Sequence, residues 1–103
     1  MGQTPSVEPV TIVFANQMPH TMTIDANIRA STNLMVWNAT KNLTSGQTLT
    51  AGSPRLDYGD YTFLANAHGV QCKVGPVHVD AKVDGWQVTV DPTGKMSCPV
   101  AQK

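Results

Sequence analysis

Short runs in which apolar and polar residues alternate are the feature that most restricts how this chain can fold. In the segment PVTIVFANQ, Val10, Ile12 and Phe14 take every second position, and the run 86–90 repeats the pattern. A period of two places successive side chains on opposite faces of a strand, whereas a helix needs apolar residues three or four apart. These runs therefore predict β-strands that each bury one face.

Turn-forming residues separate the runs at intervals of about 8 to 12 residues. Asp84-Gly85 is a tight-turn dipeptide, and DPTG at 91–94 marks a further turn. We predict an all-β fold, an antiparallel β-sandwich of about seven strands, with a small β-barrel as the alternative. We expect residues 1–103 to form one domain. Residues 1–6 are expected to be a flexible N-terminus or, in part, a cloning remnant.

The region 28–43 leaves the choice between strand and helix open. Residues 34–37 form a short apolar run, typical of a buried strand, but Ile28, Met35, Ala39 and Leu43 could also share one face of a helix. The many Asn and Thr residues around them are poor helix formers, so we favour the strand.

Proline and glycine predict where other strands stop. Asn16, Gln17 and Pro19 predict a hairpin loop between the first two strands, because proline lacks a backbone donor and fixes φ. Gly75-Pro76 predicts a break between two short β runs.

The charge composition excludes several function classes. Charged residues make up 14% of the chain, and seven basic residues balance seven acidic ones. We therefore expect no nucleic-acid partner, which would need a basic surface. No apolar stretch approaches the roughly 20 residues needed to cross a bilayer, so we also expect no membrane insertion. A surface of Thr, Asn, Ser and Gln with many Val residues favours a secreted or periplasmic protein. The first residues show neither the charged region nor the apolar region of a signal peptide. We expect the mature secreted chain to begin near Gln3, with its signal peptide absent from this sequence.

The two cysteines, Cys72 and Cys98, are predicted to form a disulfide in an oxidising compartment. A bridge across a loop of about 25 residues stabilises a fold by about 3 kcal/mol in the chain-entropy treatment. The alternative is a pair of buried thiols in a reducing cytosol.

The segment DYGDYTF resembles the D-x-G-x-Y-x-C signature that begins the F strand of immunoglobulin-like domains. Asp57, Gly59 and Tyr61 match its positions, and Phe63 stands where the family has cysteine. The resemblance implies a tyrosine corner, in which the Tyr61 hydroxyl bonds the backbone across the turn. It also suggests Trp37 as the buried strand-C tryptophan. Transthyretin-like sandwiches share a G-x-Y-x-F pattern, so the resemblance implies a related β-sandwich and no particular function.

A possible metal site lies in QMPHTM, where Met18, His20 and Met22 stand at every second position. On one face of a strand, two thioethers and an imidazole would suit copper(I). Pro19 interrupts the alternation, so we favour a loop whose side chains do not converge. We expect no cofactor, with copper as the alternative.

No catalytic signature is present in the sequence. It has no nucleophile elbow, phosphate loop or dinucleotide fingerprint, and Asp57 and Asp60 are typical turn residues. His68 and His78 flank Cys72 without the convergent set of ligands that zinc needs. We predict that the protein is not an enzyme.

The large aromatic rings and two sequons are the remaining candidate sites. Tyr58 and Trp86 lie in or beside turns and are predicted to be exposed and to contact a ligand. NAT and NLT make Asn38 and Asn42 possible glycosylation sites.

Together these features predict a non-enzymatic secreted or envelope-associated domain that binds a protein or glycan partner at the cell surface. Two alternatives remain open. One is a small copper-binding protein. The other is a secreted inhibitor or effector that acts through a protruding QMPHT loop.

Overall fold

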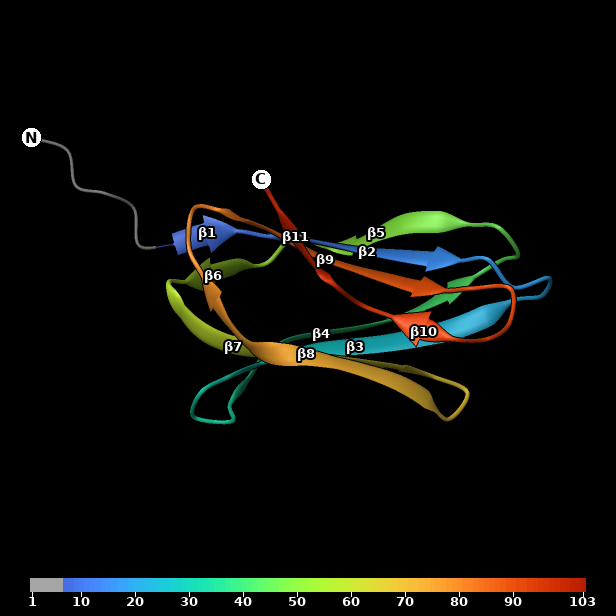
Figure 1. Ribbon diagram of the computed structural model, residues 1–103, viewed down its shortest axis with the longest axis horizontal. Coiled ribbons are helices and arrows are strands. Elements are labelled where there is room, and N and C mark those ends of the chain that lie inside the picture. The colour runs from blue at the N-terminus through green and yellow to red at the C-terminus, as the bar shows by residue number, and fades with distance from the viewer. Residues whose placement is uncertain (1–6) are drawn as a thin grey trace, which may run out of the picture.

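The structure is a computed structural model that describes residues 7–103. It shows two β-sheets packed face to face, with a two-stranded ribbon at one end (Figure 1). The prediction of an all-β sandwich is confirmed. Eleven strands are present in the described residues, because several short strands pair at the ends and edges of the sandwich. Residues 1–6, for which a flexible N-terminus was expected, lie outside the described residues.

The four-stranded sheet is antiparallel, in the order β4-β3-β7-β8: β3 (Met22–Ala30), β4 (Met35–Leu43), β7 (Gly59–Ala67) and β8 (Val70–Val79). The five-stranded sheet has the order β10-β9-β2-β5, with β11 also paired to β9: β2 (Thr11–Asn16), β5 (Thr48–Gly52), β9 (Val83–Val90), β10 (Met96–Ser97) and β11 (Val100–Gln102). Within it β2 and β9 run parallel. A two-stranded ribbon of β1 (Val7–Pro9) and β6 (Arg55–Asp57) lies at one end.

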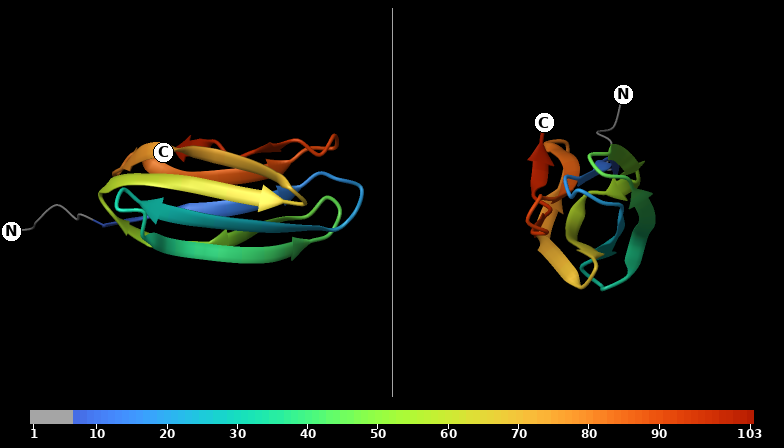
Figure 2. Two further views of the ribbon diagram at one scale, coloured as in Figure 1. Left: turned by 90° about the horizontal axis from the view of Figure 1, so that it is seen from below. Right: turned by 90° about the vertical axis from the view of Figure 1, so that its right-hand side faces the viewer.

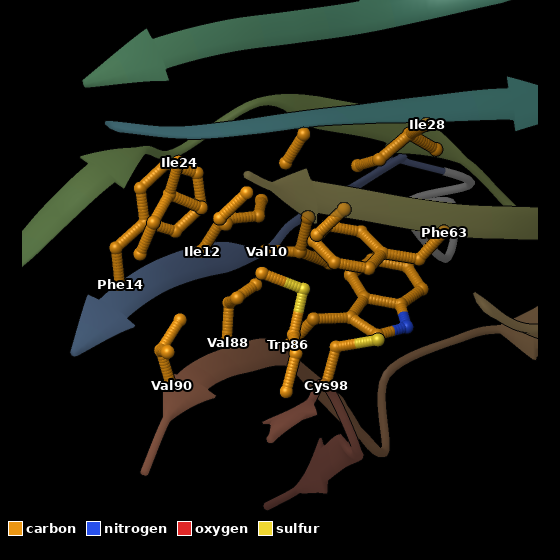
Figure 3. Close-up of a cluster of buried hydrophobic side chains, with 14 of the residues drawn as sticks. Val10, Ile12, Phe14, Ile24, Ile28, Phe63, Trp86, Val88, Val90 and Cys98 are labelled. Carbon is orange, nitrogen blue, oxygen red and sulfur yellow. The ribbon is translucent and has the colours of Figure 1, made fainter. Parts of the chain in front are cut away.

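Alternate side chains from both sheets fill the space between them (Figure 3). Each large aliphatic or aromatic residue buried there contributes about 1.5–3 kcal/mol relative to an exposed position. The core includes Val10, Ile12, Phe14, Ile24, Ile28, Phe63, Trp86, Val88 and Val90. The alternation in the sequence therefore marked the residues that hold the sheets together.

A stacked ring pair and a disulfide link the two halves of the sandwich in addition to the packed core. The Trp86 indole on β9 stacks on the Phe63 ring on β7, with centroids 5.2 Å apart and planes at 9°. Such a pair adds about 0.5–1.5 kcal/mol beyond burial. The predicted Cys72–Cys98 disulfide is present, and it ties β8 to the segment between β10 and β11.

The segment between β2 and β3 is not a hairpin loop, so that prediction is wrong. β2 pairs with β5 and β9, whereas β3 pairs with β4 and β7, so the segment crosses from one sheet to the other. Asn16 and Pro19 do end the strand as expected. Turn residues carry no information on which strand the next one pairs with, and both strands have an apolar face that can pack across the core.

The ambiguous region after Ile28 forms strands, which confirms the preference for strand over helix. The expected burial of its apolar run is wrong, because Leu34, Met35 and Val36 are exposed. The predicted break at Gly75-Pro76 is wrong, because β8 runs through it. One extra residue on β8 shifts the pairing with β7 between Tyr61 and Phe63. A bulge of this kind accommodates a proline without ending the strand.

The tyrosine corner implied by the DYGDYTF segment is present. The Tyr61 hydroxyl donates to the backbone oxygen of Asp57 at 2.7 Å. Trp37, in contrast, is not the buried tryptophan that the resemblance suggested. It lies partly buried on the edge strand β4 with its indole against Gly52, where an added Cβ would lie 2.8 Å from Trp37 Nε1.

Candidate functional site

Three loops gather at one end of the sandwich, at the right of Figure 1: residues 17–21, 44–47 and 91–95. We call this set the loop end. Most of its residues are exposed, including Pro19, His20, Ser45, Pro92 and Thr93. Loops held on a rigid sandwich are where such folds most often carry binding residues.

Asn16 fixes the first loop from inside the molecule. Its side chain is 1% exposed, and Nδ2 donates to the backbone oxygens of His20, Leu43 and Thr44 at 2.9, 3.1 and 3.0 Å. Its Oδ1 accepts from the Met18 N–H at 2.9 Å. One buried amide thus holds the 17–21 loop against the 44–47 loop.

In each of the other two loops, a side-chain oxygen accepts hydrogen bonds from the loop's own backbone. We call such a side chain, like that of Asn16, a clamp. Gln47 Oε1 accepts from the Thr44 N–H at 2.9 Å. Asp91 Oδ1 accepts from the Thr93 hydroxyl, the Thr93 N–H and the Lys95 N–H at 2.6, 2.9 and 3.0 Å. The Thr93 hydroxyl and the Lys95 N–H lower the pKa of the Asp91 carboxyl from its usual value, since these bonds favour the charged form.

Contacts between the loops make them one unit. Ser45 Oγ donates to the Met18 oxygen at 2.8 Å, and the Gln17 N–H donates to the Val90 oxygen at 2.8 Å. The Met18 side chain lies beside Gly94, where an added Cβ would be 3.9 Å from Met18 Cε. The loop end is therefore an exposed surface on a fixed backbone.

The candidate copper ligands do not converge. Met22 is 5% exposed in the core, Met18 packs towards Gly94, and His20 is exposed with Nδ1 3.2 Å from the Thr21 oxygen. Only Met22 of the three belongs to a strand, so the alternation in QMPHTM does not place them on one face. Within residues 7–103, no three His, Cys, Asp or Glu side chains are grouped as a metal would require.

The two aromatic residues predicted to contact a ligand differ in position. Trp86 is 1% exposed in the core, so the prediction that it is exposed is wrong. Tyr58 is partly buried, and its hydroxyl donates to Glu8 Oε1 at 3.4 Å. Burial, followed by the charge of Glu8, raises the pKa of Tyr58. Tyr58 lies beside β6 and β7, apart from the loop end.

The remaining predicted residues lie on the four-stranded sheet. Asn38 and Asn42 are exposed on β4, so both sequons are accessible. His68 is in the β7–β8 turn, while His78 Nδ1 lies 2.9 Å from Asp60 Oδ1 in an exposed pair. Exposed pairs of this kind stabilise a fold by about 0–1 kcal/mol.

Sequence reasoning missed the clamps and one ion pair. The partners of Asn16 lie up to 28 residues away along the chain, so no local pattern marks them. Asp91 had a usable signal, because an Asp that opens DPTG commonly accepts bonds from its own turn. Glu8 is 7% exposed and pairs with Lys103, at the other end of the described chain.

Comparisons with protein-family models, curated proteins and solved structures find no match for this chain. Within residues 7–103, no helix has the length and apolar character to cross a membrane.

Proposed function

We propose that this protein is a non-enzymatic secreted or envelope-associated binding domain, and that a protein partner docks on the loop end. The observation that carries the proposal is that all three loops are fixed by their own side-chain clamps. A surface whose backbone is already ordered loses little conformational entropy on binding, so its contacts convert more fully into affinity.

The surface chemistry of the loop end suits a partner recognised by shape and hydrogen bonds. Pro19 and Pro92 add stiff apolar rings, while His20, Ser45 and Thr93 offer polar groups. Asp91 and Lys95 give this surface one charge of each sign. Long-range electrostatic steering would contribute little to association with such a surface. The Cys72–Cys98 disulfide supports the oxidising compartment in which the partner would be met.

An inhibitor or effector is the second candidate function, and the anchored 17–21 loop favours it. A loop that blocks an enzyme must keep its shape when it enters the active site. The buried Asn16 amide supplies that restraint through four hydrogen bonds. The partner would then be an enzyme, whose activity would fall on binding.

Affinity capture from the extracellular and envelope fractions of the source cells tests the proposal. The wild type and a Pro19→Ala/His20→Ala variant are compared with a control, Thr32→Ala/Leu34→Ala, which changes exposed residues of the β3–β4 turn at the opposite end. We expect one stoichiometric partner with the wild type and the control. The loop variant should bind it about tenfold more weakly or worse.

Two results would contradict the proposal: no stoichiometric partner is retained, or the loop variant retains it as well as the wild type does. Retention should also be insensitive to metal chelators. If the partner is an enzyme that the wild type inhibits and the loop variant does not, the inhibitor function is established.

A further inference from the structure

A hollow of about 590 Å³ lies on the outer face of the four-stranded sheet, turned away from the core. Figure 2 (left) views this face, and the β3–β4 and β7–β8 turns project beyond it at the lower left and lower right of Figure 1. The residues used below are Asn27, Arg29, Asp60, Thr62, Leu64 and Lys73. None of the hollow's lining residues in the described chain is aromatic.

Two cations, Arg29 and Lys73, outnumber the single carboxylate of Asp60 in the lining of the hollow, on a chain whose net charge is zero. Arg29 on β3 and Lys73 on β8 flank the intervening strand β7. Strand spacing and rise separate their Cα atoms by roughly 12 Å, so both side chains can reach a ligand that lies over β7. Arg29 Nη1 donates to the Asn33 oxygen at 3.2 Å, which holds the guanidinium near the β3–β4 turn. Asp60, the acidic residue of the lining, is engaged with His78.

Polar groups that donate and accept hydrogen bonds lie between the two cations. Thr62 is opposite Arg29, and Leu64 lies between Asn27 and Lys73 in the strand register. Asn27 Oδ1 is buried without a hydrogen-bond partner. In residues 7–103, only one other buried side-chain nitrogen or oxygen lacks a partner. An unpaired buried acceptor is unfavourable, so a side-chain rotation that turns it towards the hollow would offer it to a ligand hydroxyl.

We propose that this hollow binds a carboxylate-bearing saccharide of the uronate class. Sugar hydroxyls both donate and accept, which matches the mixed amide and hydroxyl lining. Leu64 gives an apolar floor for the C–H face of a sugar ring, and the Arg29 guanidinium can pair with its carboxylate through two parallel bonds. An extended peptide is disfavoured, because the hollow lies on a sheet face, where no backbone edge is free to pair with it.

Isothermal titration with three uronate tetramers, of galacturonate, glucuronate and mannuronate, tests the site. Each tetramer is compared with its methyl ester, which keeps the shape and removes the charge. At least one tetramer should bind, and its ester should bind about tenfold more weakly or worse. Arg29→Ala and Lys73→Ala should each weaken binding about tenfold, and Arg29→Lys should lose less. Lys82→Ala removes an exposed cation outside the hollow and should bind like the wild type.

Three results would overturn the site: none of the tetramers binds, the methyl esters bind equally, or Lys82→Ala is as weak as Arg29→Ala. Hexaglutamate is a carboxylate-bearing peptide. If it binds as tightly as the best uronate tetramer, and Arg29→Ala and Lys73→Ala weaken its binding too, the assignment of the ligand as a saccharide is overturned. Arg29→Gln replaces Arg29→Ala if melting curves show that the alanine variant is unfolded. The site is independent of the loop end, so Pro19→Ala/His20→Ala should bind uronate normally. Arg29→Ala should likewise capture the protein partner normally.

Discussion

At the scale of single residues, Asn16 has the largest influence on the candidate binding surface. It is a buried polar side chain with four hydrogen bonds to two separate stretches of backbone, residues 18–20 and 43–44. A buried polar group is favourable only when it is fully paired. Removal of the amide takes a donor from the oxygens of His20, Leu43 and Thr44, of which Thr44 keeps the Gln47 N–H.

We expect Asn16→Ala to lower the free energy of unfolding by about 2–4 kcal/mol. Asn16→Asp should be at least as destabilising at neutral pH, because a carboxylate oxygen would face the carbonyls of His20, Leu43 and Thr44. Urea denaturation measures both values. Asn38→Ala, at an exposed position, is the control and should change stability by under about 0.5 kcal/mol. A loss below 1 kcal/mol for Asn16→Ala, on the order of one net hydrogen bond, would contradict this account.

At the scale of elements, the edge strand β4 carries its own protection against pairing with another chain. Lys41 is opposite the buried Ile24, so it belongs to the row of β4 that faces the core side. A lysine in that row of an edge strand discourages edge-to-edge association. Exposed Leu34 precedes this strand and exposed Met35 and Val36 begin it, so association would otherwise be favoured there.

Lys41→Val should therefore make the protein self-associate. Light scattering during size-exclusion chromatography should show dimers or larger species for the variant at concentrations where the wild type is monomeric. Lys82→Val, which changes an exposed turn residue, should behave like the wild type. A monomeric Lys41→Val protein would show that another feature protects the edge.

The disulfide stabilises the other edge of the four-stranded sheet. It links the edge strand β8 covalently to the C-terminal segment. Replacing both cysteines by alanine should lower the unfolding free energy by about 3 kcal/mol, through the greater entropy of the unfolded chain. Urea denaturation with and without reductant measures the effect. Reductant should destabilise the wild type and leave the Cys72→Ala/Cys98→Ala variant unchanged. Equal stability of the two proteins without reductant would contradict the prediction.

At the scale of the whole molecule, the sequence predicted what depends on periodicity and missed what depends on distant partners. The alternation of Trp86, Val88 and Val90 already placed Trp86 in a buried row. The prediction of exposure depended on a turn at Asp84-Gly85, and that turn prediction is wrong, because β9 (Val83–Val90) runs through both residues. The sheet assignments of β2 and β3, the partners of Asn16 and the hollow all join residues far apart in sequence. No local pattern carries such information.

Stability across the whole molecule should fall in alkali, because three groups shift in the same direction. Burial raises the pKa of Tyr61 and of Tyr58, and the hydrogen bond to Glu8 raises the pKa of Lys103. A group whose pKa is higher in the folded state stabilises the fold below its unfolded pKa and loses that contribution as the pH rises through the folded value. The unfolded values are about 10 for Tyr and 10.4 for Lys, so the urea midpoint should decrease above about pH 10.

The two tyrosines, the only ones in the chain, allow a direct measurement of this shift. Absorbance at the phenolate band should show both ionising at a higher pH in the native protein than in urea. Tyr61→Phe removes the bond to the Asp57 oxygen, so it should lower stability at neutral pH. The same variant should lose less stability between neutrality and alkali, since one of the shifted groups is gone. Native tyrosines that titrate at or below the unfolded value would contradict the burial of Tyr61 and the contact between Tyr58 and Glu8, because each requires the neutral phenol to be favoured in the folded state.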